Sequence, residues 1–594
     1  AVLTARANYL IALASEGLLG YKREAVEIPV YLANSIITAK EIEDTVVVNG
    51  KPVKVVKIEA GGEIFYIPSR IVSKALDLLS DLGMFLDAKI PFEAPNFQKE
   101  IQKYGLTKEE KEIVKECYNK LLNFKKMNID SVWIPILKTH LASTYYKGFD
   151  FILGNPPWIA YRYLPSDYQA KIKELTKDVY GLVSEEHLMT HMEMATLFLV
   201  RCLDIYLNDG GYLGFVMPKS IMYSDQHDNF RLQKVSIGYK FEKFIDCRVK
   251  PLFYVPACAT IVRKKKGEVA KEVSTIVVEG RLPEDRHKVM SWAEAKSKLR
   301  LYENRKLHLN TIGSRSFFSE RKLGTISGKS HYYRSFYQGA AIFPQSCWFV
   351  DIVGESNGEV LVKTSGRARI RGKYADKIPL LPIERNFLYY ALTSAEILPF
   401  CHLKPNTVVL PIIPSGSKYI LLDKEKARYG GYRYLVEWLT RAEKIWAKSK
   451  SSKKMSLYER IDYQHLLTNQ NPNAKYTVVY LKSATHLASC VIYNEYWKER
   501  SDLKKPIIIE STLYRFFTNN PDEAYYLTAI FNSSILDALI KPMQTKGFTG
   551  AERDIHKKPL EFPIPKFDGN NSLHVQLSGL GGKAAEKAYE ILHR

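Results

Sequence analysis

Hydrophobic positions in the first 265 residues alternate between two periods. Short apolar runs typical of strands lie at Ile28–Leu32, Phe149–Leu153, Tyr212–Met217, Phe244–Asp246 and Thr260–Val262. Between them, apolar residues recur at helical spacing over about 69–84, 107–125 and 184–207. This alternation is typical of a doubly wound α/β sheet, which is the fold class we predict for this part of the chain. The run Phe149–Leu153 is predicted to be a buried strand.

A β-hairpin is predicted early in the chain. Val46–Val48 and Val53–Ile58 flank Asn49-Gly50, a dipeptide that suits a type I′ turn. We expect this hairpin and the helices after it to form an insertion near 42–125, outside the main sheet.

The composition and the hydrophobic pattern of the sequence change near residue 330. Aromatic residues, short apolar runs and clustered basic residues follow, with one strongly apolar helix predicted at Ala524–Ile540 and a strand at Pro559–Pro565. The polar stretch 265–330 gives no clear pattern of elements. We therefore predict a first domain at 1–330 and a second, α+β domain at 331–594.

Composition and charge narrow the function. Of the 594 residues, 46% are hydrophobic and 25% charged, which excludes a disordered chain, a collagen and a disulfide scaffold. Lys and Arg number 86 against 64 Asp and Glu, a net charge of +22. Such an excess indicates a polyanionic partner, most simply nucleic acid, although a generally basic proteome would give the same balance.

The cysteines and histidines indicate neither disulfides nor a metal. The seven cysteines form no CxxC pair, which fits a reducing compartment. His187 and His191 lie one turn apart, a spacing more typical of a helix surface than of a zinc site. No signal peptide is visible and no apolar run reaches the ~18 residues of a membrane span, so we expect a cytoplasmic protein without a membrane partner.

The tetrapeptide Asn155-Pro156-Pro157-Trp158 carries the most specific chemistry. It follows the predicted strand Phe149–Leu153, and ligands of doubly wound sheets bind beyond the carboxyl ends of strands. Two prolines make the loop stiff and remove two N–H donors. The Asn155 side-chain oxygen and the Pro156 carbonyl can both accept hydrogen bonds from an exocyclic NH2 group, and Trp158 can stack on a base. The alternative is a rigid turn at the end of a strand.

These residues resemble the S-adenosylmethionine-dependent DNA adenine-N6 methyltransferases, whose catalytic motif is (D/N)PP(Y/F/W). The resemblance implies a Rossmann-like domain that flips an adenine out of duplex DNA and methylates N6, with Asn155, Pro156, Pro157 and Trp158 as catalytic residues. Phe253, in Asp246–Pro256, matches the aromatic residue that packs on the other face of the base. Asn34 stands at the end of the strand whose last polar residue, commonly Asp, contacts the cofactor; Asn155 would contact it too.

The C-terminal half resembles the target-recognition domain of type IIG restriction–modification enzymes. The residues that carry this resemblance are Phe531–Ser534, Gly547–Gly550, Arg553–His556 and Phe562–Pro565. Two basic clusters lie within this half, and Lys and Arg side chains are typical phosphate contacts. With a recognition domain around them, we predict DNA contacts from the following residues: Lys363, Arg367, Arg369, Arg371, Lys450, Lys453 and Lys454.

The glycine-rich loop that such enzymes place before the acidic cofactor strand is missing. No GxG follows a strand, and Gly579–Lys583 has the wrong spacing for a P-loop. Ala1–Leu13 already resembles the helix after the acidic strand, so we expect the chain to be incomplete at its N-terminus. The missing segment, and any nuclease, would be on a separate chain, lost, or outside this sequence.

Two further functions stay open. Without the cofactor loop, the chain would be a DNA-binding specificity component or an inactive remnant. Asn-Pro-Pro-aromatic motifs also serve methyltransferases of protein glutamine and RNA bases, but the large C-terminal half favours DNA.

Overall fold

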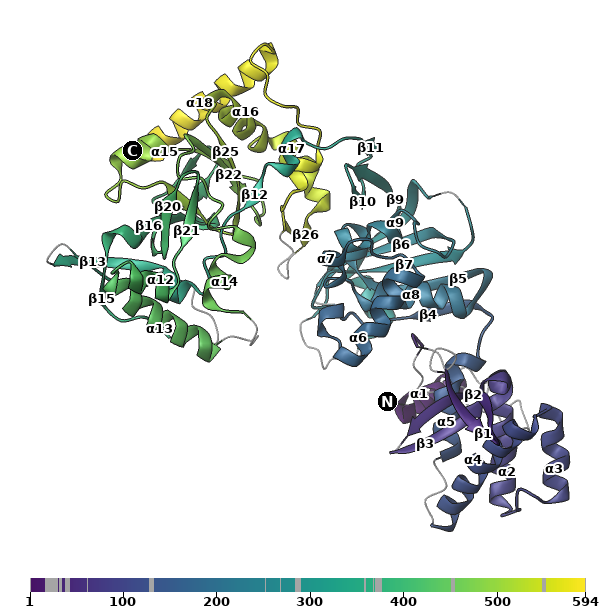
Figure 1. Cartoon of the computed structure of the whole chain (residues 1–594). Coiled ribbons are helices and arrows are strands. Elements are labelled where there is room, and N and C mark those ends of the chain that lie inside the picture. The colour runs from purple at the N-terminus through teal and green to yellow at the C-terminus, as the bar shows by residue number, and fades with distance from the viewer. Residues whose placement is uncertain are drawn as a thin grey trace.

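The computed structural model describes residues 2–15, 30, 35–37, 43–60, 62–127, 133–250, 253–267, 269–283, 290–356, 359–366, 368, 376–449, 455–546 and 552–592. Figure 1 shows an N-terminal part in purple, a central part in teal and a C-terminal part in green and yellow. We call these the N-terminal, central and C-terminal regions. None of the helices in the described ranges is both long and apolar enough to cross a membrane.

The N-terminal region has a hydrophobic core of its own. Its elements are α1 (Val2–Ser15), β1 (Glu43–Val48), β2 (Lys51–Ala60), β3 (Glu63–Pro68), α2 (Ala75–Asp87), α3 (Pro95–Ile101), α4 (Lys108–Lys126) and α5 (Trp133–Tyr145). The hairpin follows the prediction: β1 pairs antiparallel with β2, and Asn49 and Gly50 both have positive φ, as a type I′ turn requires. This separate core extends beyond 125 to α5, which packs against α2.

The central region is built on a mixed sheet with the strand order β10-β9-β8-β6-β7-β5-β4, and β11 pairs with β9. Its strands are β4 (Phe149–Gly154), β5 (Leu207–Pro218), β6 (Tyr239–Lys250), β7 (Ala257–Lys264), β8 (Glu272–Arg281), β9 (Leu299–Ile312), β10 (Arg315–Ser319) and β11 (Thr325–Ile326). The helices are α6 (Ser166–Lys173), α7 (Glu186–Met189), α8 (Met194–Ile205), α9 (Asp228–Arg231) and α10 (Trp292–Ser297). β4 and β5 are parallel, and α8 lies between them in sequence and packs on β5, which confirms the α/β class.

One prediction for this region is corrected, and the structure shows elements in one stretch for which the sequence pattern predicts none. The helix expected over 184–207 is interrupted, because residues 190–193 leave helical geometry and Glu193 forms a β-bridge with Ala160 before α8 begins. The polar stretch 265–330 is not irregular. It adds β8, β9, β10 and β11 to the sheet, and its polarity reflects the exposed residues that β9 carries along most of its first half.

The C-terminal region consists of several small sheets and surrounding helices. Its strands are β12 (Tyr337–Gln338), β13 (Val350–Ser356), β14 (Glu359–Thr364), β15 (Leu381–Ile383), β16 (Leu388–Leu392), β17 (Ile397–Leu398), β18 (Cys401–His402), β19 (Asn406–Val409), β20 (Ile412–Ser415), β21 (Lys418–Leu421), β22 (Tyr476–Leu481), β23 (Ser489–Tyr493), β24 (Ile507–Ile509), β25 (Leu513–Thr518), β26 (Thr545–Lys546) and β27 (Glu552–Arg553). Its helices are α11 (Gln345–Trp348), α12 (Lys424–Tyr429), α13 (Arg433–Ser449), α14 (Leu457–Ile461), α15 (Asn494–Arg500), α16 (Pro521–Phe531), α17 (Ser534–Ile540) and α18 (Ser572–Leu592).

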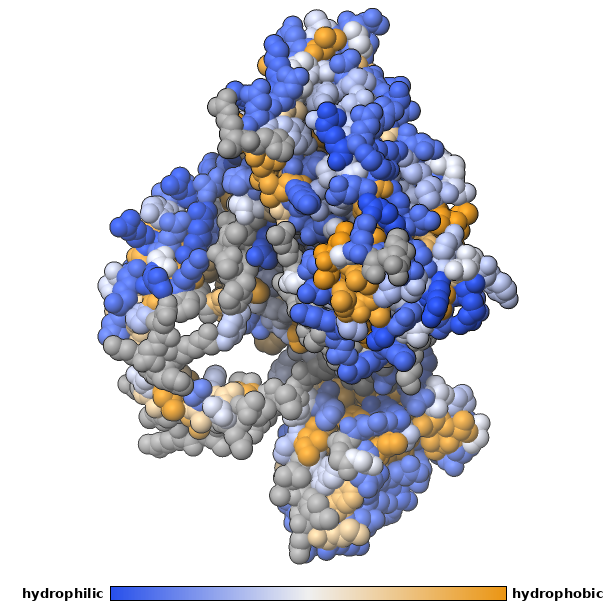
Figure 2. All heavy atoms as spheres, turned by 90° about the vertical axis from the view of Figure 1, so that its left-hand side faces the viewer, coloured by the Kyte–Doolittle hydropathy of each residue, from blue (hydrophilic) through white to orange (hydrophobic). Residues whose placement is uncertain are grey.

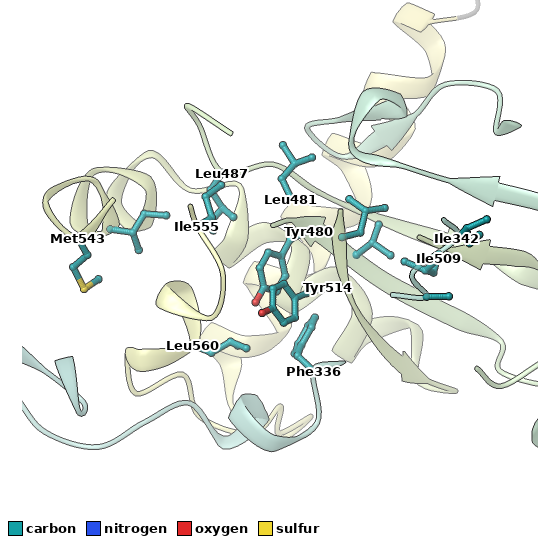
Figure 3. Close-up of a cluster of buried hydrophobic side chains, with 14 of the residues drawn as sticks. Phe336, Ile342, Tyr480, Leu481, Leu487, Ile509, Tyr514, Met543, Ile555 and Leu560 are labelled. Atoms are coloured by element: carbon teal, nitrogen blue, oxygen red, sulfur yellow. The ribbon is translucent and has the colours of Figure 1, made fainter. Parts of the chain in front are cut away.

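Aromatic side chains fill the centre of this region. Figure 3 shows Phe336, Tyr480 and Tyr514 pointing toward one another, with Leu560 nearby, while Met543 lies apart from them. The rings of Tyr480 and Tyr514 are stacked with centroids 5.2 Å apart. This packing joins the sheet β12-β25-β22-β23 to the segments near the C-terminus. The outer face shown in Figure 2 is mainly hydrophilic, with apolar residues gathered in a few patches.

Two further predictions are wrong in this region. The apolar run Ala524–Ile540 forms two helices, α16 and α17, because Ser533 caps a second helix by accepting a hydrogen bond from the Leu536 N–H. The predicted strand Pro559–Pro565 begins instead with a short 3-10 helix, Lys558–Glu561, followed by extended chain without strand pairing. Prolines lack the N–H that a ladder needs.

Buried charges link this 3-10 helix to the central region. The Glu561 side chain is almost fully buried and accepts from the Ser314 N–H at 3.3 Å. Its two oxygens lie 3.4 Å from the cationic groups of Arg315 and Lys329. Arg315 also pairs with Asp225 at 2.8 Å. The central and C-terminal regions therefore meet through a compensated set of charges, within one continuous hydrophobic cluster.

Removing Glu561 tests this link. Glu561→Ala leaves Arg315 and Lys329 without their shared acceptor, so we expect the free energy of unfolding to fall by about 2–4 kcal/mol. Urea denaturation measures the change. The control is Glu590→Ala, which removes an exposed ion pair with Lys587 on α18 and should cost less than about 0.5 kcal/mol. Equal effects of the two variants would contradict the proposed link.

Candidate active site

The Asn-Pro-Pro-Trp loop leaves the sheet at the carboxyl end of β4. Gly154, the residue before it, lies close to Phe215 of β5: a Cβ at position 154 would stand 3.1 Å from the ring. Phe215 is buried under α8, where its ring packs on Phe198. The glycine thus allows the chain to cross the ring closely before the loop begins.

Trp158 is fixed in this loop by two contacts. Its indole N–H donates a hydrogen bond to the Val216 carbonyl of β5 at 3.1 Å. Its ring packs on Phe253 with centroids 5.0 Å apart and an interplanar angle of 51°. The structure therefore brings together the two aromatic residues that the sequence places on opposite faces of a base.

The other three residues of the motif differ in their exposure to solvent. Pro156 is buried, whereas Asn155 and Pro157 are exposed. Among the described residues, Asn155 makes no side-chain hydrogen bond, so its amide is available to an incoming group. A stiff loop with an exposed amide beside two aromatic rings suits recognition of a planar base that carries an amino group.

The chain after Trp158 is tied to the start of α8. The Met194 N–H donates to the Ile159 carbonyl, and the Tyr161 N–H donates to the Met192 carbonyl, each at 2.9 Å. Between these bonds, Ala160 and Glu193 form the β-bridge. Sequence reasoning missed this anchor, because residues 159–161 carry no recognised motif and the sequence pattern places residues 192–194 in one continuous helix over 184–207.

The strand that carries the motif is not buried, contrary to the prediction. Phe151 is 73% exposed and Leu153 is 85% exposed. Within the described chain, β4 pairs only with β5 and is the edge strand of the sheet. An apolar run predicts burial but cannot reveal whether a neighbouring strand lies on each side. The apolar residues of β4 therefore face outward at the site.

The candidate cofactor residue Asn34 lies outside the described residues. Its neighbours are anchored beside α8, since the Ser35 carbonyl accepts from the Tyr206 hydroxyl at 3.1 Å and the Ile36 carbonyl accepts from Arg201 at 2.9 Å. Gly579, Gly581 and Gly582 lie inside α18, so they form no phosphate-binding loop at the start of a helix.

The cysteines of the central sheet do not supply a nucleophile. Cys258 in β7 is buried, and burial raises the pKa of its thiol to about 12. Burial also raises the pKa of Cys247 in β6, with a smaller contribution from Asp246. Both groups are therefore protonated thiols at neutral pH, and the thiolate is the reactive form. This leaves the amide, the carbonyls and the aromatic rings of the loop as the chemistry of the site.

Of the seven residues predicted to contact DNA, one lies among the described residues. Lys363 lies in β14, while Arg367, Arg369, Arg371, Lys450, Lys453 and Lys454 lie outside the described residues. The segments next to the clusters are joined by an ion pair of Lys448 with Asp376 at 2.8 Å. Here a groove of about 410 Å³ runs between residues 377–379 and α13, lined by Lys377, Ile378, Pro379, Glu437, Thr440, Arg441, Lys444 and Ile445.

Part of this chain is similar to a known protein family. Residues 47–253 match the family described as Eco57I restriction-modification methylase. This segment contains the Asn-Pro-Pro-Trp loop and Phe253, and it is similar to a restriction–modification methylase. A search of curated proteins gave no match.

Solved structures of restriction–modification enzymes are similar at low identity. The Type IIL enzyme MmeI in complex with DNA has 9% identity and a TM-score of 0.45, covering 73% of this chain and 48% of MmeI. The DrdV–DNA complex has 12% identity and a TM-score of 0.33, covering 87% of this chain and 56% of that one. The type IIG endonuclease BpuSI has 14% identity and a TM-score of 0.22, covering 74% and 49%. The chain thus spans about half the length of these proteins.

The exposure of β4 gives a direct test. In this 594-residue chain, Leu153→Ala should change the free energy of unfolding by less than about 0.5 kcal/mol, because the side chain is 85% exposed. Leu213→Ala, on the neighbouring strand and fully buried, should cost about 2–5 kcal/mol. Urea denaturation of both variants measures the difference. A similar loss for the two would mean that the outer side of β4 is covered.

Proposed function

From the methylase match over residues 47–253, we propose that this protein takes part in S-adenosylmethionine-dependent methylation of adenine N6 in duplex DNA, within a restriction–modification system. The carrying observation is the arrangement at the end of β4, where exposed Asn155 stands in the same loop as Trp158, whose ring packs on Phe253. Site-specific reading of the DNA is assigned to the C-terminal region.

Asn155 and Pro156 would act on the amino group of the target base. The side-chain oxygen of Asn155 and the carbonyl of Pro156 each accept a hydrogen bond from the exocyclic NH2 group. Two acceptors favour a tetrahedral nitrogen whose lone pair points away from the ring. When bound, S-adenosylmethionine would supply the methyl group to this lone pair and would leave as S-adenosylhomocysteine as its sulfur–methyl bond breaks, while the amine would release one proton to solvent.

Trp158 and Phe253 would hold the ring of the base. A flat base between them requires two contacts of about 3.5 Å, or roughly 7 Å between the ring centroids. The observed separation is 5.0 Å, so the rings must move apart by about 2 Å. Trp158 is held by Val216, whereas Phe253 is 42% exposed, which favours movement of Phe253. Stacking on both faces then offsets part of the cost of unstacking the base.

The residues fit the substrate side of the reaction better than the cofactor side. Asn155, Trp158 and Phe253 meet at one point, whereas the candidate cofactor contact Asn34 lies outside the described residues. The sequence also has no glycine-rich loop after a strand. We therefore propose that a further segment, on this or another polypeptide, completes the cofactor pocket.

The groove on α13 is proposed to face the DNA backbone. Lys377, Arg441 and Lys444 line it, and Glu437, which pairs with Arg441 at 3.0 Å, is its one acidic residue. Positive side chains along a groove bind phosphates and set the register of the duplex without reading bases.

The central experiment is transfer of a labelled methyl group from S-adenosylmethionine to duplex DNA. We expect label on adenine N6 with the wild-type protein, assayed together with the segment that completes its cofactor pocket, and a rate lower by about 100-fold or more with Asn155→Ala, because the amine loses one of its two acceptors. Asn473→Ala, a substitution of an exposed asparagine in the C-terminal region, is the matched control and should keep the wild-type rate.

Other results would point to other functions. DNA binding without transfer would favour a DNA-binding specificity component or an inactive remnant. Label on RNA or on protein glutamine, but not on DNA, would overturn the choice of substrate.

The groove is tested by the salt dependence of DNA binding. The double variant Lys377→Gln, Lys444→Gln should lower the slope of log Kobs against log[salt] by about 0.9 for each phosphate that the groove no longer neutralises. The control is Lys583→Gln, Lys587→Gln on α18, which removes the same charge elsewhere. An unchanged slope in the groove variant, with the wild type binding DNA, would exclude Lys377 and Lys444 as phosphate ligands.

A further inference from the structure

We propose that Glu193 and Ser220 are positioning residues, whose hydrogen bond sets the orientation of Trp158 in the Asn155–Trp158 loop. This inference rests on the proposed function, since it concerns the same loop. Neither residue belongs to the motif, and they come from two segments that are separated by 27 residues in the sequence.

The hydrogen bond closes a ring of contacts around the loop. The ring runs from Trp158 along the chain to Ala160 and crosses the β-bridge to Glu193. Both carboxylate oxygens of Glu193 lie within hydrogen-bond distance of the Ser220 hydroxyl, at 2.9 and 2.8 Å. The ring then follows the chain back from Ser220 to Val216, whose carbonyl accepts from the Trp158 indole at 3.1 Å.

The bond therefore adds a link between the loop after β4 and the turn after β5, beyond the parallel pairing that already joins the two strands. The loop follows β4, and Ser220 lies just beyond Pro218, the last residue of β5. The Lys219 N–H donates to the Pro256 carbonyl at 2.8 Å, which links the same turn to the segment that carries Phe253. A shift of Ser220 would change the placement of both aromatic residues together.

A buried histidine lies next to the carboxylate on its other side, without a hydrogen bond between them. His227 is fully buried, with Nε2 3.5 Å from a carboxylate oxygen of Glu193 and Nδ1 3.2 Å from the Thr196 hydroxyl. Thr196 lies on α8, the helix that Glu193 precedes as its N-cap. The side chain of Glu193 is only 19% exposed. The rotamer of Glu193 is thus fixed by neighbours from the two turns after β5 and from α8. The ring of contacts around the loop is therefore rigid.

The test separates positioning from a general effect on stability. Ser220→Ala removes the hydroxyl, whereas Ser220→Thr retains it, and Glu193→Gln keeps an oxygen that accepts from Ser220. The control is Ser578→Ala, which removes another buried hydroxyl that donates to a carboxylate, Asp522 at 3.1 Å, on α18.

The first readout is hydrogen exchange of the Trp158 indole N–H, measured by NMR and assigned with Trp158→Phe. We expect Ser220→Ala to accelerate this exchange by about tenfold, the effect of one lost hydrogen bond of about 1.4 kcal/mol. Ser220→Thr, Glu193→Gln and Ser578→Ala should stay near wild type. Faster exchange in Ser578→Ala as well, or unchanged exchange in Ser220→Ala, would overturn the proposal.

The second readout is methyl transfer. We expect Ser220→Ala to lower kcat by about tenfold with little change in KM for DNA, because orientation rather than binding is impaired. A change in KM alone would contradict the positioning role. If the wild-type protein transfers no methyl group even with its cofactor pocket completed, the proposed function fails, and the indole exchange still decides whether Glu193 and Ser220 position Trp158.

Discussion

A fully buried arginine must have acceptors for its donors, and this requirement organises the turns after β5. Arg231 donates to the carbonyls of Ile221 and Ser224, to the Asp228 carboxylate and to the Ser316 hydroxyl. Burial lowers the pKa of Arg231, while Asp228 opposes that shift. Because a buried cation without partners is very unfavourable, these segments can move only together. The same turns adjoin Arg315 and, through it, Glu561 of the C-terminal region.

The end of β5 is consequently the fixed point of the candidate site. Val216 holds the Trp158 indole, Ser220 holds Glu193, and Ile221 begins the set of acceptors around Arg231. A rigid turn at this place connects the loop after β4 with the C-terminal region over a few residues. Signals between the two regions would pass through hydrogen bonds and ion pairs rather than through a flexible linker. Preorganisation of this kind is what an enzyme needs to orient a reacting amine.

The parts that sequence predicted best are those fixed by local chemistry. Asn49-Gly50 has positive φ at both residues, and the hairpin that it predicted is present. The roles expected for Trp158 and Phe253 from the family resemblance stay predictions, although the two rings lie together. The predictions that failed concern features that depend on residues far away in the sequence. An apolar run such as Phe149–Leu153 has the same pattern in a central strand and at an edge. Glu193 escaped notice because Ala160 and Ser220, its partners, are far away in sequence. The interruption of the helix predicted over 184–207 likewise depends on the β-bridge between Glu193 and Ala160.

The two sides of the Asn155–Trp158 loop differ: the β5 side is held by hydrogen bonds, whereas the outer side at β4 is exposed. On the β5 side, Trp158 and Glu193 are held by several hydrogen bonds. On the outer side, β4 presents Phe151 and Leu153 to solvent within the described chain. Water around such apolar side chains is unfavourable, and a parallel strand normally has both faces covered. A segment that covered them would also lie next to Asn155, where a methyl donor has to reach the amine. Under the proposed function, completion of the cofactor side and coverage of β4 are therefore expected to be a single event.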